Sequence, residues 1–261
     1  MLMALTRDVS ARIVECELTH LAREPVDVQR ARLQHAAYEQ TLRELGVHVK
    51  RVDDGEDFPD SVFIEDTAVV VDEVAIITWP GAATRRGETD AVAAALGKYR
   101  PLVRLTEPAT LDGGDVLCVG KRVWVGRSAR TNAEGIGQLS AALKPFGYKV
   151  ESLDIRGCLH LKSAVTAIGD SVVLINPAWV DRQAFAGMEF IDVHPEEAMA
   201  ANALLVGQTV LFPRHFPRTA ERLERRGVKL VRVACDELAK AEGALTCCSL
   251  LFHADGVTAA G

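Results

Sequence analysis

Five clusters of polar residues recur along the chain at nearly regular intervals. The clusters are Glu65-Asp66, Asp112 to Asp115, His160, Asn202 and Cys247-Cys248, and from Asp66 the steps to Asp115, His160, Asn202 and Cys247 are 49, 45, 42 and 45 residues. Such a period is typical of repeat architectures. Each cluster precedes a hairpin-like stretch, for example FIEDTAVVVDEVAIITWP. If the repeats close around an axis, the five clusters meet in one pocket that holds a cysteine, a histidine and several carboxylates.

Helical patterns alternate with the hairpins. The β-branched runs VAIIT, VWVG, VVLI and TVLF are bounded by Gly, Asp or Pro and predict strands. Amphipathic spacing predicts helices over 28–45, 85–99, 129–146 and 218–226, with Pro145 and Gly147 ending the third. No stretch rich in Pro, Gly or Ser divides the chain. We therefore expect one α/β domain over 1–261, built from strand, strand and helix units.

Composition excludes some classes of binding partner and indicates where in the cell the protein is located. A net charge of -6 disfavours nucleic acid, which normally binds a basic patch, and no apolar run is long enough to cross a bilayer. The N-terminal stretch lacks the pattern of a secretory signal, which predicts a cytoplasmic protein with free thiols. Four of the six cysteines, namely Cys16, Cys118, Cys158 and Cys235, have apolar or strand-like surroundings that favour small buried hydrophobes.

Cys247 and His160 are the candidates for chemistry. A thiol is a nucleophile only as thiolate, and imidazole titrates near working pH, so His160 suits a general acid and base. Taken alone, a Cys-Cys pair and a histidine between apolar residues are more often buried core. Their positions in the repeat favour the functional interpretation.

The acidic clusters admit two interpretations. Asp112 and Asp115 flank two glycines, which is typical of a tight turn, and one carboxylate could orient His160. Glu65 and Asp66 suit a planar guanidinium through paired hydrogen bonds. Zinc held by Cys247, His160 and Asp66 is the competing hypothesis. No HExxH, CxxC pair, P-loop or dinucleotide glycine motif supports a metal or nucleotide enzyme.

Six ordered motifs resemble a known family. FPDSVFIEDTAVV, PGAATRRGE, TLDGGDVL, ARTNAEG, LHLKSAVT and EGALTCCSL resemble the dimethylarginine dimethylaminohydrolases of the guanidine-modifying superfamily. The resemblance implies a five-bladed, pseudo-symmetric α/β propeller of ββαβ-type repeats and hydrolysis of Nω-methylated arginines, without a cofactor, to citrulline and a methylamine.

The resemblance also implies residue roles. Cys247 matches the nucleophile, His160 the acid and base, and Asp112 the acid that orients the histidine. The substrate contacts that it implies are Glu65 and Asp66 at the guanidinium, Asp60 at the α-amino group, Arg85 and Arg130 at the carboxylate, and backbone carbonyls of Leu18 and Ala241. Trp79 stands where the family pattern has arginine and receives no role. Zinc, if bound at Cys247, is expected to inhibit.

Two rivals stay open. An arginine or agmatine deiminase, or an amidinotransferase, uses a similar set of cysteine, histidine and acids but is usually longer. A non-catalytic propeller that binds another molecule would leave Cys247, His160 and the acidic clusters unexplained. The oligomeric state, a homodimer included, also stays open. The expected partner is a small molecule, with no nucleic acid and no membrane.

Overall fold

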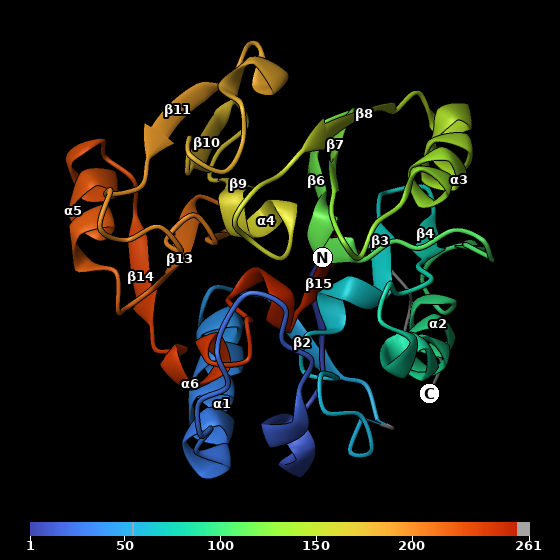
Figure 1. The fold of residues 1–261 in the computed structure, drawn as a ribbon, viewed down its shortest axis with the longest axis horizontal. Coiled ribbons are helices and arrows are strands. Elements are labelled where there is room, and N and C mark those ends of the chain that lie inside the picture. The colour runs from blue at the N-terminus through green and yellow to red at the C-terminus, as the bar shows by residue number, and fades with distance from the viewer. Residues whose placement is uncertain (54, 255–261) are drawn as a thin grey trace.

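The computed structural model describes residues 1–53 and 55–254, and within them the chain forms five three-stranded sheets. Sheet by sheet, the strands are β15 (Leu250–His253), β1 (Leu2–Thr6) and β2 (His48–Arg51); β3 (Ala68–Val70), β4 (Ala75–Ile77) and β5 (Leu102–Arg104); β6 (Val116–Val119), β7 (Arg122–Arg127) and β8 (Lys149–Asp154); β9 (Val165–Ala167), β10 (Val172–Ile175) and β11 (Glu189–Asp192); β12 (Leu204–Val206), β13 (Thr209–Pro213) and β14 (Leu230–Val233). The sheets stand around a common centre, so the fold is the five-bladed α/β propeller that the resemblance implied (Figure 1).

The helices divide between the rim and the centre of this ring. They are α1 (Val28–Glu44), α2 (Thr89–Leu96), α3 (Ala133–Leu143), α4 (Leu161–Ala164), α5 (Pro217–Arg225) and α6 (Asp236–Ala239). Figure 1 shows α1, α2, α3 and α5 on the outside, whereas α4 lies near the centre beside β9. The predicted ββαβ repeat is confirmed in this arrangement, because a helix connects the second and third strands of each blade except between β10 and β11. There a 3-10 turn, Arg182–Phe185, takes the place of the helix.

Every blade has the same pairing pattern. In the second blade β3 pairs antiparallel with β4, with Ala68 opposite Ile77, and β5 pairs parallel with β4. The first blade obtains its hairpin from opposite ends of the chain, since β15 lies antiparallel to β1 and Leu5 stands opposite Leu250. The last strand of the chain thereby closes the ring.

Two predicted helices are shorter than expected. Helix α3 starts at Ala133 because the Asn132 side chain accepts a hydrogen bond from the Gly135 N–H and caps the helix there. Helix α2 starts at Thr89, and Ala83–Glu88 forms a 3-10 turn instead. This turn carries the Arg85 side chain into the protein, where it is 4% exposed.

Apolar packing fills the spaces between neighbouring blades. Ile76 of β4 packs with Val125 of β7 and Leu139 of α3, and the equivalent cluster between the next two blades contains Trp124 and Ile175. Each blade therefore buries its apolar faces only against its neighbours and its own helix, which explains the even repeat in the sequence. None of the described helices has the length and apolar character needed to span a membrane.

The prediction that Cys118 is buried is wrong. Cys16, Cys158 and Cys235 are buried as expected, but Cys118 is exposed to a cavity of about 300 Å³ at the centre of the ring. Its strand, β6, lines that cavity together with first strands of other blades. The apolar neighbours of Cys118 in the sequence face the space between blades, whereas its own side chain faces the axis.

Candidate active site

Four of the five polar clusters meet where the chain enters the first strand of a blade. Glu65 and Asp66 lie in the 3-10 turn η2 (Ile64–Thr67), Asp112 directly precedes η4 (Gly113–Asp115), and Cys247 lies in η7 (Thr246–Cys248). His160 occupies the position before α4. Because all of these turns start strands at the centre of the ring, their side chains converge.

A small cavity collects most of the predicted site residues. Its volume is about 20 Å³, and it is lined by Glu17, Asp60, Phe63, Asp66, Arg85, Arg130, Leu159, His160, Ala241, Glu242, Gly243 and Cys247. Seven of the ten predicted site residues are among them. Asp112, Glu65 and Leu18 are the exceptions: Asp112 lies behind His160, Glu65 lines the central cavity instead, and Leu18 packs partly buried against the core of the first blade.

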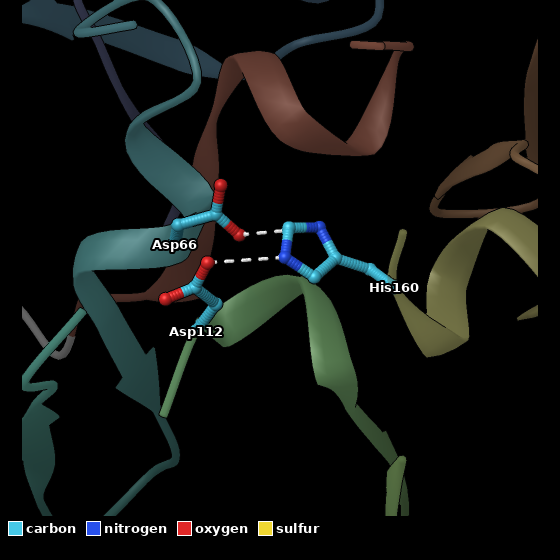
Figure 2. A group of neighbouring side chains, drawn as sticks. All are labelled: Asp66, Asp112 and His160. Carbon is cyan, nitrogen blue, oxygen red and sulfur yellow. Dashed lines mark hydrogen bonds and ion pairs between the residues drawn. The ribbon is translucent and has the colours of Figure 1, made fainter. Parts of the chain in front are cut away.

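His160 faces two buried carboxylates on one side of its ring. Its Nε2 lies 3.1 Å from Asp112 Oδ2, and its Nδ1 lies 3.8 Å from Asp66 Oδ1, as Figure 2 shows. Burial disfavours the imidazolium, but the negative charges of the neighbouring aspartates outweigh burial and raise the pKa of His160 to about 9. The ring is therefore protonated at neutral pH and can donate a proton.

The glycine pair in DGGD is required for this close approach. A Cβ on Gly114 would lie 2.6 Å from His160 Nδ1 and 2.8 Å from Asp66 Oδ1. The Gly114 N–H instead donates to Asp66 Oδ1 at 2.9 Å. Burial disfavours the Asp66 carboxylate, yet His160, Arg85 and this N–H together lower its pKa to about 2. Asp66 is thus a fixed negative charge in the cavity.

Asp115 holds the backbone next to His160 and makes no hydrogen bond with the ring. Its carboxylate accepts hydrogen bonds from Ser128 Oγ, Thr131 Oγ1 and the Leu161 N–H, at 2.5, 2.7 and 2.9 Å. It therefore fixes the backbone that carries His160. The sequence left Asp112 and Asp115 as alternatives for orienting the histidine, and only the contacts of each carboxylate distinguish them.

The two adjacent cysteines face different surroundings. Cys247 is half-buried at the cavity, whereas Cys248 is 1% exposed and its thiol donates to the Ala244 carbonyl at 3.3 Å. The pair lies in the 3-10 turn η7. Burial, and then the charges of Glu65 and Asp66, raise the pKa of Cys247 to about 12. The thiol is therefore protonated until a positive charge comes near.

A polar network behind Cys247 involves two residues that the sequence did not single out. Lys162 Nζ donates to Glu65 Oε1 at 2.5 Å, and Thr246 Oγ1 donates to Glu65 Oε2 at 2.8 Å. Asn202 holds Thr246 twice, accepting from its N–H at 3.0 Å and donating to its hydroxyl at 2.9 Å. The fourth polar cluster, Asn202, thus fixes the turn that carries Cys247. Chain position alone gave no sign of Lys162 or Thr246.

The two predicted arginines differ in how they are held. Arg85 makes a paired contact with Glu88, at 3.0 and 2.8 Å, and its Nη1 donates to Asp66 Oδ2 at 2.5 Å. Arg130 donates to Thr19 Oγ1 at 3.3 Å. Trp79 does not line the cavity, and the guanidinium of Arg86 lies 4.9 Å from the centre of its ring.

Ligand-type atoms of Asp66, Asp112 and His160 lie within 4.8 Å of one another. Cys247 stands outside this group, so the described side chains are not arranged as the zinc set of Cys247, His160 and Asp66 that the sequence suggested.

Comparison with known proteins agrees with this geometry. The family model described as eukaryotic N,N dimethylarginine dimethylhydrolase matches residues 18–208, more than half of the chain. The chain belongs to the dimethylarginine dimethylaminohydrolase family. It is 43% identical over 248 residues to the N(G),N(G)-dimethylarginine dimethylaminohydrolase of Streptomyces coelicolor, with 95% of each chain covered.

Solved structures of dimethylarginine dimethylaminohydrolases have the same fold. A cysteine-to-serine variant from Pseudomonas aeruginosa, complexed with citrulline, matches with a TM-score of 0.91 at 33% identity, covering 96% of this chain and 98% of that one. A histidine-to-glycine variant in an adduct with S-methyl-L-thiocitrulline matches with a TM-score of 0.91 at 33% identity, covering 96% and 99%. Both variants concern the residue types that stand together in the cavity described above.

Proposed function

We propose that this chain hydrolyses Nω-methylated L-arginine to L-citrulline and methylamine or dimethylamine through a covalent intermediate on Cys247. The observation that carries the proposal is the cavity in which a half-buried thiol, a protonated histidine and a fixed carboxylate come together. Membership of the family supports the choice of substrate, and so do the relatives solved with citrulline and with a thiocitrulline adduct.

In this proposal the substrate activates its own nucleophile. A guanidinium bound beside Asp66 places a positive charge near the Cys247 thiol, which lowers the pKa of the thiol from about 12 and favours the thiolate. The thiol releases its proton to solvent, because His160 is already protonated, and the thiolate attacks the central guanidinium carbon. His160, protonated below its pKa of about 9, gives its proton to the departing amine, and a thiouronium remains on Cys247.

The second half of the reaction uses the histidine that has just lost its proton. Neutral His160 accepts a proton from water as the water oxygen attacks the thiouronium carbon. The C–S bond then breaks with its electron pair going to sulfur, the new hydroxyl group gives its proton to the Cys247 thiolate, and citrulline is released. Asp112 holds the ring through its contact with Nε2. No step requires a cofactor.

The other cavity residues account for an amino acid substrate. We assign Asp60 to the α-amino group and Arg130, with Arg85, to the carboxylate, while carbonyls of Leu18 and Ala241 stay predicted contacts. Arg85 already binds Asp66 and Glu88, so Arg130 is the arginine with more freedom to bind a ligand. Glu65 acts from behind the thiol, through Thr246, in addition to its predicted attraction for the guanidinium.

Phe63 and Leu159 are the large apolar side chains that line the cavity, and they provide the surface for N-methyl groups. Apolar contact with one methyl group discriminates by only about 1–3 kcal/mol, so some turnover of close analogues is expected. We further infer that 1–261 forms one catalytic domain, because β1 and β15 close the same ring. A cytoplasmic location and a homodimer stay predictions.

The test is a competition among asymmetric dimethylarginine, monomethylarginine, arginine and agmatine, with citrulline, carbamoylputrescine and each released amine measured separately. Methylated arginines should win, with citrulline and a methylamine as products. Cys247→Ser should abolish turnover, and Cys248→Ser, the matched control one residue away, should retain most of it. If arginine or agmatine wins with release of ammonia, a deiminase replaces the proposed function.

A further inference from the structure

Residues 19–21 contact two residues that line the cavity, Arg130 and Glu242, and the Glu242 carboxylate holds their backbone. Glu242 Oε2 accepts a hydrogen bond from the Thr19 N–H at 3.0 Å, and Glu242 Oε1 accepts from the N–H groups of His20 and Leu21 at 2.5 and 2.6 Å. Three successive N–H groups aimed at one anion form a strong, charge-assisted contact. The side chains of Thr19, His20 and Leu21 are exposed, so little apolar burial holds this segment in place.

Glu242 adopts a backbone conformation that the chain otherwise reserves for glycine. Its φ is 58°, and the other described residues with positive φ are glycines at seven positions. It follows α6 at the left-handed position of a helix end, where its N–H donates to the Ala239 carbonyl and the Gly243 N–H donates to the Leu238 carbonyl. Gly46, Gly147 and Gly227 have the same sign of φ after α1, α3 and α5.

A residue with a side chain is disfavoured in this conformation, so its presence indicates that the side chain has a use. Glycine would form the same helix end without strain. The conformation of Glu242 instead directs a carboxylate to the backbone of residues 19–21. The backbone conformation at this position favours glycine, but the residue is Glu242.

The cavity is too small for a substrate while this contact is made. A volume of about 20 Å³ is close to that of a single water molecule, whereas the proposed substrate is a whole amino acid. Glu17, two residues before Thr19, lines the cavity, and so do Ala241, Glu242 and Gly243. Entry and release therefore require these two segments of the chain to separate.

We propose that Glu242 is a positioning residue that latches residues 19–21 over the active site, and that breaking its three hydrogen bonds opens the cavity. The inference rests on the proposed function only in taking this cavity as the substrate site. In the closed state the latch holds the substrate against Cys247. Weakening it should expose Cys247 and impair retention of the substrate.

The test measures access to Cys247 without using turnover. Iodoacetamide alkylation is followed residue by residue by mass spectrometry in the unmodified protein, Glu242→Gln and Glu242→Gly. Cys118 is the internal reference, because its thiol is exposed in a different cavity and its pKa is raised to about 11, close to that of Cys247. Glu221→Gln, an exposed acid on α5, is the matched control.

In Glu242→Gln an amide N–H₂ group replaces one carboxylate oxygen. In Glu242→Gly the side chain is removed, while glycine adopts the positive φ of this position without strain. Loss of charged hydrogen bonds should raise alkylation of Cys247 by about 10- to 100-fold in both variants, with Cys118 unchanged. Amide exchange of Thr19, His20 and Leu21 should accelerate in parallel, and KM for dimethylarginine should rise more than kcat falls. Glu242→Gly should unfold at the same or a higher temperature.

Unchanged alkylation of Cys247 and unchanged amide exchange in folded Glu242→Gly would overturn the latch. Faster alkylation with an unchanged KM would also overturn it, since closure would then have no part in holding the substrate. If dimethylarginine is not a substrate at all, the proposed function fails, and the alkylation and exchange rates still decide whether Glu242 closes the cavity.

Discussion

At the scale of single residues, the site depends on how burial and charge set protonation states. Burial alone would keep both the Cys247 thiol and the His160 imidazole neutral. The aspartates reverse that outcome for His160, which is cationic at neutral pH, and reinforce it for Cys247. A free site with a neutral thiol and a charged histidine is ready for a cationic substrate, and the thiol becomes a nucleophile only when that substrate is present.

The high-pH side of the activity profile tests the pairing of His160 with Asp112. Activity should fall as pH rises through about 9, because His160 then lacks the proton that the leaving amine needs. Asp112→Asn removes a charge that raises the pKa of His160, so this decline should move to lower pH, and turnover at pH 8 should drop by about 10- to 100-fold. Asp192→Asn changes a residue of β11 that pairs with Arg182 and not with His160, and it should leave the profile unchanged. A decline at the same pH in Asp112→Asn would contradict the pairing.

At the scale of elements, the short turn before each blade's first strand is the unit that builds the site. These turns position Asp66, Asp112 and Cys247. In the blade of β12, β13 and β14, Asn202 stands at the equivalent place and supports Thr246. Each turn is anchored by its strand and by the neighbouring turn. The site is therefore assembled from pieces that no single blade contains.

Asn202→Ala should damage turnover more than binding. It removes both hydrogen bonds to Thr246, and a small displacement of the Cys247 turn can cost about 100-fold in rate, so we expect kcat to fall by about 10- to 100-fold with KM nearly constant. Asn176→Ala is the matched control, since Asn176 is also buried but bonds to the Ala198 carbonyl. Equal losses of kcat in the two variants would reduce Asn202 to a general contribution to stability.

The sequence predicted the middle strands β4, β7, β10 and β13, the four outer helices and the convergence of the polar clusters, because period, β-branched runs and helix stop signals are local. It could not show that Arg85 is committed to Glu88 and Asp66, or that Lys162 and Thr246 join Glu65. Such contacts join residues distant in the chain, and nothing in their own neighbourhood marks them. The left-handed conformation of Glu242 was hidden for the same reason, since an acid there gives no turn signal.

At the scale of the whole molecule, the ring is closed by strands from the two ends of the described chain. β15 follows the Cys247 turn almost directly and pairs with β1, so closure of the ring and placement of the nucleophile are the same structural event. A loss of pairing between β1 and β15 should therefore lower both the free energy of unfolding and the activity.

Leu5→Ala tests that coupling. Leu5 is fully buried in β1 opposite Leu250, and its truncation should lower the free energy of unfolding by about 2–5 kcal/mol. Leu33→Ala on α1, where the side chain is 73% exposed, should change it by less than about 0.5 kcal/mol. Denaturant unfolding followed together with residual activity makes the comparison, and a loss of stability without an earlier loss of activity would separate ring closure from the site.

The most direct measurement is acid quenching of the protein during turnover of asymmetric dimethylarginine, followed by mass spectrometry of the peptide that carries Cys247. The account predicts a transient adduct on Cys247 with the mass of the substrate less dimethylamine, formed before citrulline and absent in Cys247→Ser. Citrulline production with the adduct on another residue, or with none at any time, would contradict it.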